Sequence, residues 1–447
     1  MSVRTVHLTN AWHPASGGIR TFYEALLQRA AADRRNIAVI VPGERTTVSQ
    51  VGPTARLYTI EAPRSPLFDR RYRVLLPHRY LRVSRSVLWR ILAREQPDVV
   101  EISDKYCLCH LAGLIKGRAR GGIRPTLVAL SQERLDDNIR AWVSDTTWAQ
   151  RCARQYLRWV YLTQFDAHIA NSEYTAQELR DIVARSRPRQ TRIHRLGGRV
   201  HVVPLGVDAT GFGPGRRSHD VRLALLRRAG GSENTSLIVY AGRLSPEKYV
   251  QWLPEIVSRL RAVGLDVALA VAGDGPARGH VEAGLLRAAG GRAVFLGHLH
   301  SRDELATLLA SADLFLHPNP REPFGIGPLE AMASGTPVVA PRAGGVLSYA
   351  DEATAWLGEP SVDGLAHAVS HCLADPVAAR ARATAGRFRA ASLDWPRVAR
   401  RFLDLYEWLH TERLAAEAPP ASGPRVPSPV AAVSVHRLAA GTGPGYQ

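Results

Sequence analysis

The 447-residue chain contains no apolar run that approaches the roughly 18 residues needed to span a bilayer. A strand-like segment already begins at Thr5, so no signal peptide is expected at the amino terminus. These two absences predict a cytoplasmic protein, and peripheral contact with the inner membrane face stays open.

Cysteine is scarce as well. The four cysteines fit neither a disulfide framework nor the ligand spacing of a structural zinc site: Cys107, Cys109, Cys152 and Cys372. Cys107 and Cys109 leave a metal-binding fragment as an alternative, but free thiols in a reducing compartment are the default expectation.

Acidic residues do not balance the basic ones, because 40 Asp and Glu face 58 Lys and Arg and the formal net charge is +18. This excess indicates an anionic partner, such as nucleic acid, a membrane surface or a phosphorylated substrate. No nucleic-acid-binding signature accompanies it, so nucleic acid is not expected. The sequence also lacks the G-x-G-x-x-G fingerprint, which leaves a dinucleotide-dependent oxidoreductase unsupported.

The length of the chain exceeds what one ordinary core accommodates. Short apolar segments alternate with helical ones, which predicts parallel sheets with helices on both faces. Residues 209–219 are rich in Gly and Pro and suit a linker. We therefore predict an α/β protein with domains over residues 1–208 and 209–394, a helix over 395–411 and a disordered tail over 412–447.

The stretch Arg321–Gly335 carries the most informative pattern. It follows an apolar run and holds two glycines around Ile326, which permit positive φ or close approach to a ligand. Pro328 suits the first position of a short helix over 329–333, and Gly335 suits its C-terminal cap. A strand, a glycine loop and a helix N-terminus in this order form a natural anion site.

Two acids in this stretch, Glu322 and Glu330, are separated by a turn and need not point the same way. We expect them at opposite ends of one ligand, where each would bind hydroxyl groups. The alternative is a pair of solvated surface acids.

This stretch resembles the E-x7-E motif of retaining GT-B glycosyltransferases of family GT4. Three further segments match landmarks of that family in order: Ala241–Lys248 with its G-R-L-x-x-x-K pattern, Ala272–Pro276 and Phe295–Gly297. The resemblance implies a GT-B fold, with two Rossmann-like parallel-sheet domains that face a cleft. The first would take the acceptor, the second the nucleotide sugar, and the helix over 395–411 would cross back to the first.

The resemblance also implies a site. Arg243 and Lys248 would bind the diphosphate of the donor and stabilise the leaving group without a metal, since no D-x-D-like carboxylate pair is evident. Glu322 would bind hydroxyls of the sugar, and Glu330 would hold the ribose. Expected catalytic residues are thus Arg243, Lys248 and Glu322. Donor-binding residues would also include Phe324, Gly325, Ile326 and Glu330, with no metal and no cofactor beyond the GDP- or UDP-linked co-substrate.

The first domain offers further cleft candidates. Gly17 and Gly18 lie between a strand and a helix, a geometry that cradles phosphate, although such pairs also serve as simple turns. In the GT-B family this loop faces the donor diphosphate and the acceptor. Asp104 and Lys105 follow a predicted strand at its carboxyl end, where ligands bind in α/β sheets. A surface ion pair is the alternative for these two.

Gln132 stands where GT4 members often carry a histidine near the sugar. Glutamine can donate a hydrogen bond but cannot titrate, so either the register is shifted or the position serves only binding. Glu133 beside it is a cleft acid or a surface acid. In the second domain, His298 would approach the base, and Gly273–Gly275 either border the nucleotide or form a plain turn.

Residues 68–92 are the most basic stretch, and Leu81, Leu88, Trp89 and Leu92 recur among arginines at nearly helical spacing. Such a segment suits an anionic membrane or a lipid-linked acceptor. The alternative is a helix whose apolar stripe is buried in its own domain.

The resemblance implies a retaining hexosyltransferase. We predict mannosyl transfer from GDP-mannose to a lipid or glycan acceptor as the first choice. One alternative is a UDP-sugar-dependent enzyme acting on a soluble natural product. The other is a basic RNA- or membrane-binding protein with an inactive transferase fold.

Overall fold

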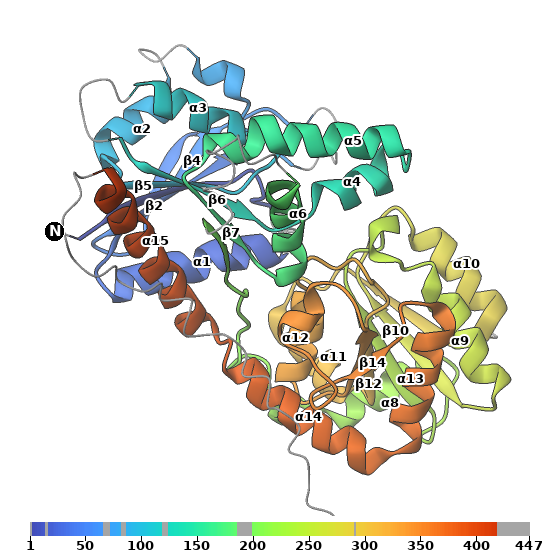
Figure 1. Ribbon diagram of the computed structural model, residues 1–447. Coiled ribbons are helices and arrows are strands. Elements are labelled where there is room, and N and C mark those ends of the chain that lie inside the picture. The colour runs from blue at the N-terminus through green and yellow to red at the C-terminus, as the bar shows by residue number, and fades with distance from the viewer. Residues whose placement is uncertain are drawn as a thin grey trace, which may run out of the picture.

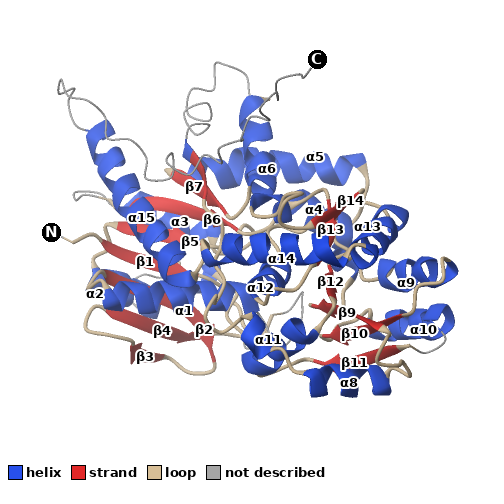
Figure 2. Ribbon diagram, turned by 90° about the horizontal axis from the view of Figure 1, so that it is seen from below, coloured by secondary structure: helices blue, strands red, loops and turns tan. Residues whose placement is uncertain are grey.

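The structure is a computed structural model that describes residues 2–13, 17–65, 72–81, 86–118, 124–185, 199–289 and 292–417. It contains two β-sheets, each with its own helices in a separate lobe (Figures 1 and 2). The predicted α/β class with two parallel-sheet domains is confirmed.

The sheet of the first lobe has eight strands in the order β3-β4-β2-β1-β5-β6-β7-β8. All neighbours pair in parallel except β3 and β4, which form an antiparallel edge. The strands are β1 (Arg4–Leu8), β2 (Asn36–Gly43), β3 (Thr47–Gln50), β4 (Ala55–Glu61), β5 (Val99–Ile102), β6 (Thr126–Ser131), β7 (Ala167–Ala170) and β8 (Val200–Val202).

The sheet of the second lobe has six strands in the order β11-β10-β9-β12-β13-β14, all parallel. They are β9 (Ser236–Ala241), β10 (Val267–Ala272), β11 (Ala293–Gly297), β12 (Leu314–Leu316), β13 (Val338–Pro341) and β14 (Trp356–Gly358). The predicted boundary at residue 208 falls between β8 and β9 and stays a prediction.

Helices cover the two sheets. Those of the first lobe are α1 (Gly17–Ala32), α2 (Val87–Glu95), α3 (Cys109–Arg118), α4 (Leu135–Trp142), α5 (Thr147–Tyr156) and α6 (Glu173–Ala184). Those that follow are α8 (His219–Arg228), α9 (Trp252–Ala262), α10 (Arg278–Ala289), α11 (Arg302–Ser311), α12 (Ile326–Ala333), α13 (Val362–Ala374), α14 (Pro376–Ala391) and α15 (Trp395–Glu417). No helix in the described ranges is both long and apolar enough to cross a bilayer.

Burial explains which strands the sequence reveals. Strands of a parallel sheet are covered on both faces and therefore form continuous apolar runs. Strand β10, with the sequence VALAVA, is buried at all six positions. Strand β3 is exposed at all four of its positions and has no such run. The sequence accordingly predicts the central strands and misses the β3–β4 edge.

The basic stretch 68–92 is described only in part, because residues 66–71 and 82–85 lie outside the described residues. Within the described part, α2 begins only at Val87 and buries Leu88 and Leu92 in the core of the first lobe. Trp89 packs against the same core and donates a hydrogen bond from Nε1 to the Tyr80 carbonyl at 2.7 Å. The part of the predicted apolar stripe that lies on α2 is thus used inside the domain, as the alternative had it, whereas Leu81 lies outside α2 and is 54% exposed.

Helix α15 crosses from the second lobe to the first and packs along α1 (Figure 1). The expected end at residue 411 is wrong, because the helix continues to Glu417. Arg413 supplies the reason: this buried side chain donates to Thr126 Oγ1 and to the Arg124 carbonyl, both at 2.8 Å, and also pairs with Glu417. Residues 412–417 are therefore helical, and 418–447 lie outside the described residues.

A buried polar cluster fixes α15 to the first sheet. Glu101 on β5 is fully buried and accepts hydrogen bonds from the hydroxyls of Tyr23 and Tyr406. His7 Nδ1 lies 3.1 Å from the same carboxylate. These contacts join β1, β5, α1 and α15 in one network.

Substitution of Tyr406 by phenylalanine should lower the free energy of unfolding by about 1.5–3 kcal/mol, because the buried Glu101 loses a charged hydrogen bond. Urea denaturation followed by circular dichroism would measure the change. Thr411→Ala on the exposed side of the same helix is the control. An unchanged midpoint for Tyr406→Phe would contradict this role of the network.

The two connections between the lobes run side by side. Val207 N donates to the Leu393 carbonyl at 2.9 Å, and Trp395 N donates to the Val207 carbonyl at 3.1 Å. Gly206 faces the Trp395 ring so closely that a Cβ atom would lie 2.6 Å from it. Glycine at 206 therefore allows the outgoing and returning chains to pack together.

Candidate active site

The loop between β12 and α12 forms the centre of the candidate site. Gly325 has φ of +88° and is the residue before the helix, which begins at Ile326. The predicted helix start at Leu329 was wrong, and Pro328 is the third helical residue instead of the first. The first turn of a helix has no internal partners for its N–H groups, so proline costs no hydrogen bond there.

The C-terminal end of α12 agrees with the prediction for Gly335, which has φ of +73° just after the helix. Its N–H bonds the Met332 carbonyl at 3.0 Å, and Thr336 N bonds the Ala331 carbonyl at 3.0 Å. This pair of bonds is the Schellman motif, which favours glycine at this position.

A second glycine pair, Gly344 and Gly345, packs against the loop between β12 and α12. Gly345 N donates to the Glu322 carbonyl at 2.6 Å, and a Cβ on Gly345 would lie 1.9 Å from the Pro323 carbonyl oxygen. The Tyr349 hydroxyl donates to the Gly325 carbonyl. The ring of Phe324 packs on Tyr349 in the core, so a donor contact by Phe324 would come from its backbone.

Lys248 and Glu322 form a close charged pair in the site. Lys248 ends the short helix η7 (Pro246–Lys248), and its Nζ lies 2.9 Å from both carboxylate oxygens of Glu322. The Glu322 side chain is 9% exposed and that of Lys248 30%. An ammonium has three donor hydrogens, so Lys248 can bind a further anion while it contacts Glu322.

Two residues that sequence reasoning missed complete this carboxylate's surroundings. Asn319 Nδ2 donates to Glu322 Oε2 at 3.0 Å, and His317 Nε2 lies 3.7 Å from the same oxygen. Both residues follow β12 at its carboxyl end, which is the signal that could have found them. His317 Nε2 is buried and makes no hydrogen bond within the described part of the chain.

Electrostatics keep Glu322 ionised. Burial alone would raise the pKa of this carboxyl, but attraction to Lys248 and His317 and hydrogen bonds from Lys248 and Asn319 outweigh it, so the pKa is lowered. Burial lowers the pKa of His317 to about 4, so the imidazole is neutral at pH 7. At neutral pH Lys248 is therefore the cation that holds the Glu322 charge.

Glu330 has a different environment from Glu322. It lies inside α12, is 8% exposed, and its Oε1 accepts from Arg302 Nη2 at 2.9 Å. Burial raises its pKa to about 7, the attraction of Arg302 offsets only part of this, and Asp208 adds to the increase. Each of the two acids thus has its own arginine or lysine partner, and Glu330 is poised between its charged and neutral forms.

The Arg243 loop rests on the loop after β10. Leu244 N bonds the Asp274 carbonyl at 3.0 Å, and Cβ atoms on Gly273 and Gly275 would lie 1.9 and 2.2 Å from the carbonyl oxygens of Gly242 and Leu244. Gly273–Gly275 therefore support the Arg243 loop through close backbone packing. The Arg243 side chain itself is exposed at the surface of this loop.

The first lobe also contacts the loop between β12 and α12. Arg321 Nη1 lies 3.6 Å from Asp137 Oδ1 of α4, and Ser172 donates a hydrogen bond to the Pro323 carbonyl. Near the start of α1, a Cβ on Gly18 would lie 2.7 Å from Ile326 Cδ1. Gly18 and the N-terminus of α12 are thus brought together, and Gly17 is the first residue of α1.

Comparison with known proteins assigns this arrangement to a family. The family model described as Glycosyltransferase Family 4 matches residues 16–210, and the one described as Glycosyl transferases group 1 matches residues 235–375. A GDP-mannose-dependent alpha-(1-6)-phosphatidylinositol dimannoside mannosyltransferase of Mycobacterium tuberculosis is 31% identical over 398 residues, which cover 89% of this chain and 94% of the relative. The chain belongs to glycosyltransferase family 4.

Two further similarities support the assignment. A GDP-mannose-dependent alpha-mannosyltransferase of Corynebacterium glutamicum is 28% identical over 78% of this chain and 75% of its own length. A sucrose-phosphate synthase of Thermosynechococcus elongatus has a TM-score of 0.69 at 21% identity, over 93% of this chain and all of that chain. The predicted GT-B fold is confirmed, and the protein is a glycosyltransferase.

The remaining first-lobe candidates of this family 4 enzyme have structural partners. Lys105 is buried, and its Nζ contacts Glu178 Oε2 at 2.6 Å and the Glu133 carbonyl at 2.5 Å. Asp104 accepts from Asn10 at 2.9 Å and from the backbone at residues 106 and 107, both at 2.7 Å. Lys105 therefore belongs to a buried ion pair. The alternative, a surface ion pair, is wrong for this residue.

Gln132, which stands in place of the family's histidine, has an unusual environment. Its Nε2 is buried and has no hydrogen-bond acceptor among the residues that the structure describes. Such buried donors without acceptors are rare in folded proteins. The binding role predicted for Gln132 stays a prediction. His298 is exposed just after β11, where its ring lies 4.7 Å from that of His300.

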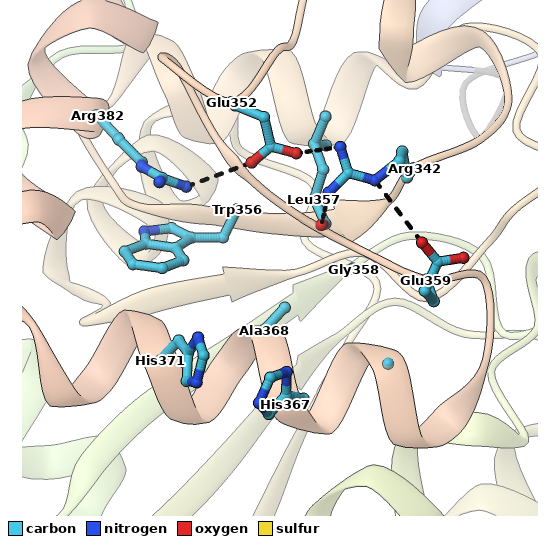
Figure 3. A pocket seen from close by; sticks show the side chains of 11 residues that line it. Arg342, Glu352, Trp356, Leu357, Gly358, Glu359, His367, Ala368, His371 and Arg382 are labelled. Atoms are coloured by element: carbon cyan, nitrogen blue, oxygen red, sulfur yellow. Dashed lines mark hydrogen bonds and ion pairs between the residues drawn. The ribbon is translucent and has the colours of Figure 1, made fainter.

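A hollow of about 340 Å³ lies apart from this loop, at the edge strand β14 and α13 (Figure 3). Its charged side chains neutralise each other, because Glu352 pairs with Arg342 and Arg382, and Arg342 also pairs with Glu359. None of the predicted site residues of the family 4 enzyme lines it. This hollow is therefore not part of the candidate site.

Substitution of Gly18 by valine should lower kcat/KM of the glycosyltransferase about tenfold to a hundredfold, because the added methyl groups push Ile326 and the start of α12 out of place. Ile326→Ala in the same chain should restore much of the loss by making room. The measurement is sugar transfer under initial-rate conditions for the two single variants and the double variant. Additive losses without rescue would show that the contact has no role in the active arrangement.

Proposed function

We propose that this glycosyltransferase moves a mannosyl group from GDP-mannose to a lipid-linked or glycan acceptor, with retention of the anomeric configuration. The GDP-mannose dependence of the mycobacterial and corynebacterial relatives supports the donor, and the lipid acceptor of the first supports the acceptor class. The structural observation that supports this function most strongly is the Lys248–Glu322 pair beside the N-terminus of α12. It offers a cation for phosphate and a charged acceptor for sugar hydroxyls within one small volume.

In this proposal Arg243 and Lys248 offset the charge that develops on the departing diphosphate, and the backbone N–H groups at the start of α12 add to this. Glu322 accepts hydrogen bonds from hydroxyls of the mannosyl group, and the uncharged His317 accepts one at Nε2, because its other ring nitrogen donates to the Asn319 backbone. Glu330 accepts from the ribose. These groups orient the donor and require no bound metal.

The transfer step requires no nucleophile from the protein. The bond between the anomeric carbon and the diphosphate oxygen breaks, and the acceptor oxygen bonds that carbon on the same face. The proton of the acceptor hydroxyl passes to the departing phosphate oxygen, so the products are GDP and the mannosylated acceptor. Preorganised cations make this leaving group a weaker base in the transition state and hence favour bond cleavage.

Thermal melting with GDP, UDP, ADP and their sugar conjugates, in the presence of a chelator, tests the proposal. A ligand at a hundredfold excess over its Kd stabilises the folded state by about 2.7 kcal/mol. We expect the largest increase in Tm with GDP and GDP-mannose and its loss in Arg243→Ala. A larger increase with a uridine nucleotide would replace the proposed donor, and a requirement for added metal would overturn metal independence.

We also propose that the enzyme works in peripheral contact with an anionic membrane. A lipid acceptor would be presented there, and the net charge of +18 would favour such a surface.

A further inference from the structure

An exposed aromatic face lies on α5 and its continuation, the short helices η3 (Leu157–Tyr161) and η4 (Leu162–Gln164). Trp148 is 74% exposed and Trp159 52% exposed, although tryptophan is highly buried on average. Cys152 and Gln155 are also exposed and fall between them at helical spacing. We call these four residues the indole face: Trp148, Cys152, Gln155 and Trp159.

The indole face is not the side of the helix that packs into the core. The opposite side of the same helix already packs into the first lobe through Ala153, Leu157 and Tyr161. Trp159 is held in its exposed position, because its Nε1 donates to Gln155 Oε1 at 2.9 Å. Two exposed indoles thus remain without a covering element among the described residues.

Arginines line one flank of the face. Arg151 and Arg154 are exposed, and the Arg158 guanidinium lies 4.9 Å from the centre of the Trp159 ring. From residue 147 to residue 161 the sequence contains these three arginines and no acidic residue. The face is therefore both aromatic and cationic, and its charge is complementary to an anionic surface.

The face also lies near the candidate site. Helix α4 packs against α5 and also against η7, which carries Lys248. Asp137 on α4 contacts Arg321 of the central loop. Figure 1 shows α5 along the outer edge of the first lobe, with α4 between it and the second lobe. A surface bound to α5 would thus be separated from the candidate site by α4.

We propose that the indole face is the surface by which this glycosyltransferase docks on an anionic lipid bilayer. Tryptophan is enriched at the membrane–water interface, because its ring is apolar and its N–H is polar. The flanking arginines would bind lipid phosphates in the same plane. This inference rests on the proposed lipid acceptor, and it replaces α2 as the docking element because the stripe of α2 is buried.

Vesicle co-sedimentation tests the proposal with the full chain. One vesicle type contains only phosphatidylcholine, and the other contains a third phosphatidylglycerol. The wild type should partition to the anionic vesicles. Trp148→Ser with Trp159→Ser, and separately Arg151→Glu with Arg154→Glu, should each lower the partition coefficient about tenfold or more.

A second basic surface in the chain provides matched controls. Helix α14 carries Phe388, which is 75% exposed, with Arg380 and Arg387 exposed on the same helix. Phe388→Ser and the double variant Arg380→Glu with Arg387→Glu make the same chemical changes there. Loss of binding in the α14 variants but not in the α5 variants would overturn the proposal, as would failure of the wild type to bind anionic vesicles.

Cys152 allows a direct measurement of insertion. It is exposed, whereas Cys109 and Cys372 are buried, so in a Cys107→Ser background a polarity-sensitive dye would label Cys152. Anionic vesicles should shift the dye emission to shorter wavelength at Cys152. The control carries Cys152→Ser and Phe388→Cys, and its label should not respond. A response only in the control would overturn the proposal.

Both binding measurements are independent of catalysis, so failure of the proposed function would not appear as failure of docking. Transfer assays link the two. The α5 variants should retain transfer to a short, water-soluble mannoside and lose about tenfold in transfer to acceptor in vesicles. Equal rates of wild type and α5 variants on vesicle-bound acceptor would contradict docking by this face.

Discussion

Substitution of Lys248 by alanine should lower kcat/KM for sugar transfer by a factor of about a thousand, since a preorganised donor to a developing charge contributes 10²–10³ in rate. A second effect adds to the first. Without Lys248, burial would dominate the Glu322 carboxyl and raise its pKa, because burial is the largest influence on that group. Glu322 would then take up a proton toward neutral pH and bind sugar hydroxyls less well.

Steady-state kinetics across pH 5.5–9 would separate the two effects. In Lys248→Ala the residual activity should increase with pH more steeply than in the wild type, because deprotonation of Glu322 adds to that of Glu330, which both proteins share. Arg278→Ala is the matched control, because Arg278 is a partly exposed cation of the same lobe that pairs with Asp274 and Glu282. A loss below tenfold in Lys248→Ala would show that this ammonium does not contact the leaving group.

Substitution of Glu330 by glutamine should change activity and stability in opposite directions. Turnover should decrease, because the amide cannot provide the charged acceptor for the ribose. The free energy of unfolding at pH 8 should increase by as much as about 3 kcal/mol, because the pKa of Glu330 is raised from 4.5 to about 7 by burial. A buried ionisable side chain that lowers stability but lies in the candidate site is typical of a functional residue.

The sign of this effect follows from proton binding. A raised carboxyl pKa means that the folded state holds the proton more tightly than the unfolded state, so stability is lost as pH rises from about 4.5 to about 7. The difference between wild type and Glu330→Gln should therefore be large at pH 8 and small at pH 4.5. Chemical denaturation at both values measures it. A lower stability of Glu330→Gln at pH 8 would refute this environment for Glu330.

Nucleotide binding should carry the same signature. If the ribose binds the ionised carboxylate, the Kd for the nucleotide should increase below about pH 7 in the wild type and stay flat in Glu330→Gln. Titration calorimetry at several pH values would decide this. A pH-independent Kd in the wild type would mean that Glu330 does not contact the ligand.

The second lobe is the part of the fold that sequence reasoning predicts best. Its strands are short apolar runs buried on both faces, as in β10, and they stand out against the helices between them. The β3–β4 edge escapes prediction because β3 is exposed and lacks this pattern. The end of α15 escapes because a single buried arginine, Arg413, extends it by contacts with residues nearly 300 positions away.

The candidate site is predicted in its residue types but not in its pairings. The glycines around Ile326 show where a loop must meet a helix, and the two acids stand out by their spacing. Nothing local shows that Lys248 would lie against Glu322 or Arg302 against Glu330, because the members of these pairs are 74 and 28 residues apart. His317 and Asn319 were missed for a related reason, since their proximity to Glu322 depends on how the loop folds back.

The position of α15 has a consequence for the order in which the protein is made. The first lobe's α1 is covered by α15, which supplies Phe402 against Phe22 and Tyr406 to the buried Glu101. A ribosome must therefore release the whole second lobe before the final piece of the first becomes available. Until then the nascent chain holds Glu101 and the apolar side of α1 uncovered, an interval in which chaperone binding would protect it. The lobe that is begun first is the one that is finished last.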